Sequence, residues 1–445
     1  MLDKFYKQFK SGTDIRGVAS EGVEGQPVNL TDDVVARMAD GFVLWLSKKV
    51  SKAPETLTIS IGRDSRISGP HIVSMCSERF KRCGATVLDC SLASTPSMFM
   101  TTVDLGCDGA LQITASHHPF NRNGLKFFTR EGGLEGSDIE EILEYAQNGD
   151  SPEEKTCGEI RKVDYMTDYA KGLCKKIKKE VNAEDYDHPL KGFKIVVDAG
   201  NGAGGFYADK VLSVLGADTT GSRYLEPDGM FPNHIPNPED ATAMASICEA
   251  VKEANADLGV IFDTDVDRGG AVDSKGNEIN RNRLVAVAAA IALEGNEGGT
   301  VVTDSITSSG LKEFIEDTLG GQHYRYRRGY KNVIDKALEL NAQGINCPLA
   351  IETSGHAAMK ENYFLDDGAY LCTKIIIKAA QMRKEGKELD ELTAALKEPV
   401  ESKEVRFKIL EPDFRACGEK IIGDLTAYAM AHDGWNVAND NREGI

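Results

Sequence analysis

A serine followed by two histidines stands out in the segment Thr114–Pro119, where Ser116 directly precedes His117. The segment follows an apolar run at 109–113 that predicts the end of a strand, and Lys126 lies ten residues after the serine. A hydroxyl, a nearby base and a cation are the groups that a covalent or phosphoryl-transfer centre requires. We therefore expect a reactive centre at Ser116.

Three aspartates, Asp263, Asp265 and Asp267, follow the apolar run 258–262 at every second position. Three carboxylates in one loop suit a hard divalent cation such as Mg²⁺. An EF-hand is excluded, because an arginine and a serine stand where that loop needs glycine and glutamate. The alternative is a solvated acidic turn, but acids placed directly after a buried strand would repel one another without a counter-ion. The spacing favours a metal site.

Two further polar clusters could bind a substrate. Glu352, Ser354 and His356 alternate after a predicted strand and could hydrogen-bond sugar hydroxyls, or could simply cap a loop. A basic cluster in this acidic chain could bind a phosphate or form a solvated face; it comprises Arg325, Arg327, Arg328 and Lys331. Neither cluster decides between its two interpretations alone.

The glycine loop Gly200–Gly205 has the G-x-G-x-x-G spacing of a dinucleotide-binding turn, a weak signal when it stands alone. NAD binding would leave the three aspartates unexplained, and no hydride-transfer pair is evident. The chain also lacks a Walker lysine, a G-x-S-x-G elbow and a kinase signature.

The elements that must position these residues alternate along the chain. Patterns of period 2 and 3.6 predict strands at 57–62, 86–90, 109–114, 193–198 and 258–262, with helices at 31–49, 70–82 and 97–104. Such alternation indicates α/β layers, in which ligands bind at the carboxyl ends of strands. The serine segment and the aspartate loop both lie at such ends.

Length and charge restrict the function further. The 445 residues suit about three or four domains. The net charge of −18 disfavours nucleic acid and anionic membranes as partners, since both need a basic face. The N-terminus has no signal core and no run approaches a membrane span, so we expect a cytoplasmic protein. The ten cysteines show no zinc-binding spacing.

Taken together, the serine segment, the aspartate loop and the segment Glu352–His356 resemble the phosphoserine, metal and sugar loops of the α-D-phosphohexomutase family. They occur in that family's order, one per domain, and the resemblance reassigns the glycine loop to the start of the second domain. It implies three successive similar α/β domains with mixed sheets around a central cleft, plus a partial α+β fourth domain. We expect boundaries at 1–155, 156–277, 278–396 and 397–445.

The resemblance also implies a mechanism. Ser116 would carry a phosphoryl group, complete a Mg²⁺ shell with the three aspartates, and exchange the group with a hexose phosphate (glucose and/or mannose) through a bisphosphorylated sugar. Arg16 and Lys126 would supply positive charge, and Lys126 or His117 would exchange the hydroxyl proton. The expected substrate-binding residues are Arg268, Gly329, Tyr330, Lys331, Glu352, Ser354 and His356.

Two departures from the family pattern lead to further expectations. No Arg/Ser/Thr-rich phosphate loop occurs after residue 398, so we expect a truncated fourth domain and weaker affinity for the sugar phosphate. Thr264 and Val266 stand where the metal loop frequently has glycines. Phosphoglucosamine mutase and a truncated, weakly active sugar-phosphate binder are the alternative functions. We expect a monomer or homodimer.

Overall fold

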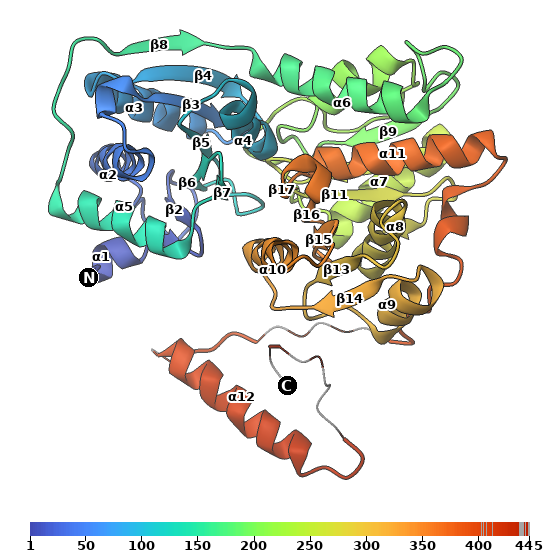
Figure 1. The fold of residues 1–445 in the computed structure, drawn as a ribbon. Helices are drawn as coiled ribbons and strands as arrows, with labels where there is room; N and C mark the ends of the chain where they lie inside the picture. Colours follow the sequence, from blue (N-terminus) through green and yellow to red (C-terminus); the bar gives the residue numbers. More distant parts are fainter. Residues whose placement is uncertain are drawn as a thin grey trace. The chain divides into compact units, whose positions relative to one another are not determined.

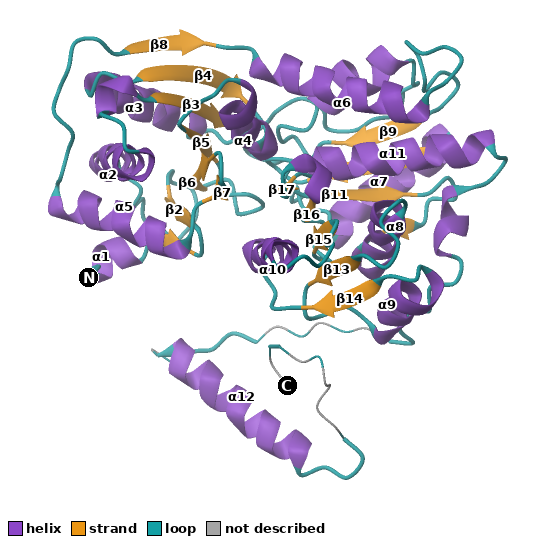
Figure 2. Cartoon of the chain, in the orientation of Figure 1, coloured by secondary structure: helices purple, strands orange, loops and turns teal. Residues whose placement is uncertain are grey.

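The computed structural model describes the chain except for residues 402, 404, 406, 412, 436–439, 441, 444 and 445. The chain divides into two compact units. Figures 1 and 2 label and colour its helices and strands. The first comprises Met1–Asn280, Ser354–His356 and Leu365–Leu389, and the second comprises Arg281–Thr353, Ala357–Phe364 and Asp390–Ile445. No helix in the described part of the chain is long and apolar enough to cross a membrane.

The first sheet has the order β1-β2-β6-β5-β3-β4-β8, with β7 paired to β6. Its central strands are parallel, whereas β6 runs antiparallel to both β5 and β2, so the sheet is mixed as expected. The strands are β1 (Lys10–Ser11), β2 (Asp14–Val18), β3 (Thr58–Arg63), β4 (Thr86–Leu92), β5 (Gly109–Ile113), β6 (Arg122–Thr129), β7 (Gly132–Gly133) and β8 (Glu159–Lys162).

Alternation along β3 explains how helices cover both faces of this sheet. Ile59 and Ile61 are buried in the core formed with α2, α3 and α5. Ser60 points to the other face, where its hydroxyl lies 2.5 Å from that of Thr101 on α4. The helices are α1 (Lys4–Lys7), α2 (Asp32–Val50), η1 (Pro54–Thr56), α3 (Gly69–Arg82), α4 (Thr95–Asp104) and α5 (Gly136–Asn148).

The second sheet of the first unit has the order β12-β11-β10-β9, with β9 parallel and β11 antiparallel to β10. Val196 and Ile261 pack against α7 on one face, while α6, the π-helix η2 and α11 lie on the other. The remaining helices and strands of the first unit are α6 (Tyr165–Val181), β9 (Ile195–Asp198), η2 (Tyr207–Leu212), η3 (Ser213–Leu215), α7 (Ala241–Ala254), β10 (Leu258–Phe262), β11 (Gly269–Val272), β12 (Glu278–Ile279), β17 (Leu365–Asp366), which is not a strand of this sheet, and α11 (Gly368–Lys384).

In the second unit the strands follow the order β14-β13-β15-β16, with β13 parallel to both neighbours and β16 antiparallel to β15. Helix α10 packs its apolar side onto this sheet. The elements are α8 (Arg281–Leu293), β13 (Thr300–Thr303), α9 (Ser309–Glu313), η4 (Phe314–Thr318), β14 (Gln322–Arg325), α10 (Tyr330–Ala342), β15 (Leu349–Ile351), β16 (Ala357–Met359) and η5 (Lys360–Asn362); η6 (Leu389–Thr393) follows α11 in sequence.

In the C-terminal part, the sequence pattern predicts a strand at 405–409 and a helix at 414–431. The helix is present as α12 (Phe414–Met430). Residue 406 of the predicted strand lies outside the described residues, and the described residues of this stretch form no strand. The β part of the predicted α+β segment remains a prediction.

Candidate active site

Ser116 lies in the loop between β5 and β6, at the carboxyl end of a parallel strand as predicted. Its backbone is left-handed, with φ of +49°, and its side chain is almost completely buried. The backbone N–H of Ser116 donates to Thr114 Oγ1 at 2.9 Å, and this hydroxyl donates to Asp64 Oδ2 at 2.8 Å. A non-glycine residue held in this region is stabilised by its surroundings, a feature common at active sites.

Arg66 holds the serine loop in this conformation. Its guanidinium is fully buried and donates to the carbonyls of four loop residues at 2.5–2.9 Å; these are Ser116, His118, Pro119 and Arg122. Asp64 lies 3.2 Å from Arg66 Nε and balances the charge. Sequence reasoning did not include Arg66 among the site residues, although its position just after β3 was the available signal.

The predicted metal loop connects β10 to β11. One oxygen from each of Asp263, Asp265 and Asp267 lies within 4.8 Å of the others, and all three residues are buried. Asp265 Oδ1 and Asp267 Oδ1 are buried and accept no hydrogen bond from any described residue. Buried carboxylate oxygens left without donors fit a bound cation, so this loop can bind a metal ion.

The electrostatics of the loop support the same conclusion. Burial and the charges of its neighbours raise the pKa of Asp263 well above its ordinary value, and burial with the charge of Asp267 raises the pKa of Asp265 to about 6. Burial also opposes ionisation of Asp267, but nearby cations, first among them Lys126, lower its pKa below the ordinary value. A divalent ion would remove the repulsion that raises the first two values.

Val266, in the middle of this loop, occupies the left-handed region with φ of +68° and is fully buried. This conformation is uncommon for any residue and a clear outlier for a β-branched one. The sequence showed valine at a position where the family frequently has glycine. The loop therefore has the backbone shape that glycine would adopt freely, and the valine is strained.

Arg268 joins the serine to the metal loop. Its Nη2 donates to Ser116 Oγ at 2.7 Å, and its Nε donates to Asp263 Oδ2 at 3.2 Å. Ser116 Oγ itself donates to Asp263 Oδ2 at 3.2 Å. The structure thus brings together two motifs separated by 147 residues. Arg268, expected at the substrate, contacts the serine and the first aspartate.

Two further residues, one on the first sheet and one on a helix that covers it, contact the metal loop. Lys126, on β6, donates to Asp267 Oδ2 at 2.8 Å. Thr95, at the start of α4, donates its backbone N–H to the Asp265 carbonyl at 2.8 Å, and its hydroxyl hydrogen-bonds the Asp265 carboxylate. Thr95 was not among the predicted site residues. Its helix-initiating Ser94-Thr95-Pro96 sequence predicts only a helix start.

The two histidines after the serine are neutral at physiological pH. Burial and the nearby charge of Arg268 lower the pKa of His117 to about 3, and burial and Arg16 lower the pKa of His118 to about 4. His117 Nδ1 lies 3.3 Å from Ser116 Oγ and also contacts the Arg268 guanidinium. Because a guanidinium can only donate, Nδ1 of this neutral ring accepts a hydrogen bond from Arg268, and the serine hydroxyl lies beside the same atom.

The predicted sugar loop is divided between the two units. In the first unit, His356 pairs with Asp366 and lies 3.9 Å from Asp267, and these carboxylates raise its pKa although burial opposes the charge. Ser354 Oγ is buried and hydrogen-bonds no described residue. Gly355 has φ of +95°, and a Cβ there would lie 2.6 Å from the Gly269 carbonyl, so only glycine fits. Asp366 was missed because it lies ten residues from the motif.

The other predicted site residues have partners outside the serine segment and the metal loop. Arg16, on β2, pairs with Asp14 at 2.9 Å in the first unit. In the second unit, Glu352 Oε1 accepts a hydrogen bond from the Gly329 N–H at 2.5 Å, which joins two predicted substrate segments. Tyr330 begins α10, and Lys331 pairs with Asp335. The structure therefore assembles two clusters, one around Ser116 and one around Glu352.

Three family models match consecutive parts of the chain. They describe the α/β/α domains I, II and III of phosphoglucomutase/phosphomannomutase and match residues 7–153, 168–276 and 280–399. The chain belongs to the phosphoglucomutase/phosphomannomutase family. This confirms the resemblance to α-D-phosphohexomutases and the α/β fold class that the motifs predicted.

The individual relatives that match this chain carry names from the same group of enzymes. A phosphomannomutase/phosphoglucomutase of Pseudomonas syringae pv. tomato is 29% identical over 371 residues, which are 82% of this chain and 75% of the relative. A phosphoglucosamine mutase of Lactobacillus helveticus is 29% identical over 395 residues, 87% and 81% of the two chains. A phosphoglucomutase/phosphomannomutase family protein of Burkholderia thailandensis has the same fold, with a TM-score of 0.78 at 24% identity, covering 99% of this chain and 88% of that one.

Proposed function

We propose that this phosphohexomutase interconverts hexose 1-phosphate and hexose 6-phosphate, with glucose and/or mannose as the sugar. Family membership supports an intramolecular phosphotransferase, and the observation that carries the proposal is the contact of Ser116 Oγ with Asp263 and Arg268. A serine placed against a cation site and a guanidinium is suited to carry a phosphoryl group, whose charge both would neutralise.

The three aspartates of the metal loop would hold Mg²⁺, since hard carboxylate oxygens are the ligands it prefers. When bound, the ion would supply charge neutralisation to the phosphoryl group. The protein contributes a prepared site: Lys126 and Thr95 orient two of the carboxylates before any ion binds. Because these carboxylates are already oriented, the charged groups need little rearrangement when the phosphoryl group is transferred.

In the proposed transfer, a sugar hydroxyl oxygen forms a bond to phosphorus while the bond between phosphorus and Ser116 Oγ breaks. The hydroxyl proton must leave at the same time, and His117 is placed to take it. The departing Ser116 oxygen keeps the electron pair of the broken bond, Arg268 stabilises its charge by donating to Oγ, and it regains a proton from His117. His117 is neutral, and a phosphate on Ser116 would raise its pKa toward the working range by adding negative charge beside it. Lys126, paired with Asp267, contributes positive charge, as Arg16 would from β2.

The cluster around Glu352 is the proposed sugar-recognition site. Glu352 can accept hydrogen bonds from two sugar hydroxyls, and its contact with the Gly329 N–H links it to Tyr330 and Lys331. Ser354 and His356, in the first unit, remain predicted substrate-binding residues. The domain boundaries predicted from the sequence remain proposals; the matched ranges of the three family models follow the first three closely. A cytoplasmic monomer or homodimer also remains a prediction.

Two measurements test the function. Intact mass spectrometry should find a species heavier by ~80 Da that disappears in Ser116→Ala, as a phosphoserine requires. Coupled assays should then show turnover of glucose 1-phosphate or mannose 1-phosphate that exceeds turnover of glucosamine 1-phosphate. A preference for glucosamine 1-phosphate would contradict the proposed substrate, and activity retained by Ser116→Ala would contradict the proposed carrier.

A further inference from the structure

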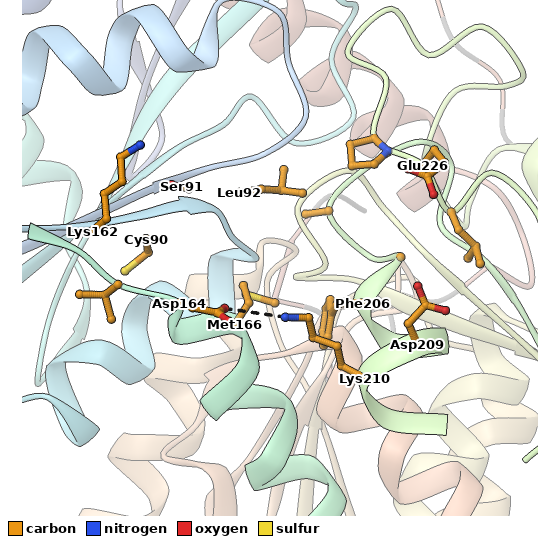
Figure 3. Close-up of a pocket in the computed structure, with 15 residues that line it drawn as sticks. Cys90, Ser91, Leu92, Lys162, Asp164, Met166, Phe206, Asp209, Lys210 and Glu226 are labelled. Atoms are coloured by element: carbon orange, nitrogen blue, oxygen red, sulfur yellow. Dashed lines mark ion pairs between the residues drawn. The ribbon is translucent and has the colours of Figure 1, made fainter. Parts of the chain in front are cut away.

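A cavity of about 570 Å³ lies within the first unit, apart from the residues of the candidate active site. Its walls come from the end of β4, from the segment that leads from β8 into α6, and from the glycine loop with the π-helix η2 (Figure 3). This volume falls in the range of about 300–1,000 Å³ that is typical of small-molecule sites. The proposed reaction does not use this cavity, although the glycine loop that the sequence singles out forms part of its wall.

The lining of the cavity is apolar in its interior. Cys90 and Met166 are buried, Leu92 and Phe206 are partly buried, and Figure 3 shows Leu92, Met166 and Phe206 around its centre. A thioether and an aromatic ring together form a surface on which a flat apolar body can pack. The interior therefore favours an organic ligand over a free inorganic ion.

The charges at the rim indicate the sign of that ligand. Asp209 and Glu226 are exposed on the same side of the cavity in Figure 3, and neither carboxylate hydrogen-bonds or ion-pairs with a described residue. Lys210 is already engaged, because its Nζ donates to Thr167 Oγ1 at 2.6 Å and lies 3.7 Å from Asp164. Lys162 lies at the opposite end. Two carboxylates near an apolar interior suit an ammonium group.

The cavity walls are connected directly to the metal loop. Ala203, in the wall, donates its backbone N–H to the Thr264 carbonyl at 2.8 Å. On the other side, Met166 Sδ lies 3.5 Å from the backbone N–H of Ser94, which immediately precedes the threonine that binds Asp265. A ligand that shifts either wall would move a direct support of the metal loop.

The local backbone is also irregular on both sides of the cavity. Ser91 has φ of +58° at a register shift between β3 and β4, and Phe206 leads into the π-helix η2. Bulges, left-handed non-glycine residues and π-helical turns are costly and are concentrated at functional sites. Both Ser91 and Phe206 line the cavity.

We propose that this cavity binds a small organic cation with an apolar or aromatic body, and that its occupancy is coupled to metal binding at the aspartate loop. The aromatic body packs on Phe206 and Met166, and the ammonium group meets Asp209 and Glu226. Coupling of this kind is reciprocal, so a bound cation and a bound metal ion change each other's affinity by the same factor.

Isothermal titration calorimetry of the full chain with tryptamine tests the site, because tryptamine joins an aromatic ring to an ammonium group. Indole-3-propionate, which carries a carboxylate instead, is the matched anionic probe. We expect tryptamine to bind at least about tenfold more tightly than the anion. The exposed double variant Asp209→Asn/Glu226→Gln should weaken tryptamine about tenfold, and Glu55→Gln, an exposed acid outside the cavity, should leave it unchanged.

Absence of tryptamine binding, equal binding of the anion, or an unchanged affinity in the double variant would overturn the proposed site. Circular dichroism of the double variant should match that of the parent chain, so that a loss of binding is not a loss of fold. The coupling is tested by repeating the titration in EDTA and in excess Mg²⁺, where we expect at least about a threefold difference in tryptamine affinity. Equal affinities would overturn the coupling.

Discussion

The strained valine in the metal loop gives a prediction about how two replacements compare at two positions. Val266 is fully buried with φ of +68°. Replacement by alanine removes two buried methyl groups, and replacement by glycine removes the Cβ as well, which costs about 0.8 kcal/mol more. The two variants also differ in the backbone: a residue with a Cβ pays about 1–2 kcal/mol in a left-handed conformation, and glycine does not.

Glycine also has a cost, because it loses more conformational freedom on folding, by about 0.5–1 kcal/mol relative to alanine. At Val266 the backbone term favours glycine, and the burial and entropy terms favour alanine by a similar amount, so the two variants should be equally stable to within about 0.5 kcal/mol. Val260, fully buried in β10 and without a left-handed backbone, is the matched control. There, Val260→Ala should be more stable than Val260→Gly by about 1.5 kcal/mol, because the backbone term is absent.

Differential scanning calorimetry of the four variants in EDTA measures both comparisons without a contribution from bound metal. We expect Val266→Gly and Val266→Ala to melt within about 1 °C of each other, and Val260→Gly to melt about 2–4 °C below Val260→Ala, shifts appropriate to free-energy differences of these sizes in a large chain. If alanine were favoured over glycine by the same amount at both positions, the metal loop would not be strained at Val266 and the argument from its backbone would fail.

Three further predictions concern the same site. Ser116→Ala should lower kcat by more than about a thousandfold in coupled mutase assays while its melting temperature stays near that of the parent chain. Asp265→Asn should weaken metal binding, measured by calorimetry, yet it should stabilise the protein in EDTA at pH 7, because it removes a buried carboxylate charge. The pKa of Asp265 is raised to about 6 in the folded protein, above its ordinary value in the unfolded chain. The metal-free parent chain should therefore lose stability as the pH rises through about 6. Arg66→Met should destabilise by about 3–5 kcal/mol in urea unfolding, whereas the half-buried Arg63→Met should cost much less.

The sequence predicted the strands and helices of the first unit well, because these depend on local pattern. The run 258–262 is apolar at every position and becomes the buried strand β10. The three aspartates that follow are close in sequence and therefore close in space. The contact between Ser116 and Asp263 could not be derived from periodicity, since it depends on how two sheets pack; it was expected only through the family resemblance.

The residues that could not be predicted from the sequence share a physical property. They support the backbone or another side chain of the site, and their residue types alone do not indicate a functional role. Arg66 is one of the 52 basic residues in the chain, and nothing in its neighbourhood shows that it will accept burial. It is buried because four carbonyls of the serine loop point toward one place, and only a planar group with five N–H donors can satisfy them together.

The same reasoning explains why a serine can be held in a left-handed conformation at the centre of the site. Turning Ser116 to φ of +49° costs free energy, and it also directs the loop carbonyls inward, where Arg66 binds them. The hydroxyl is then directed outward to Asp263 and Arg268. The position of the Ser116 hydroxyl is therefore set by two buried cations, Arg66 on the backbone side and Arg268 on the hydroxyl side. This arrangement predicts that loss of Arg66 disturbs the metal loop as well as the serine.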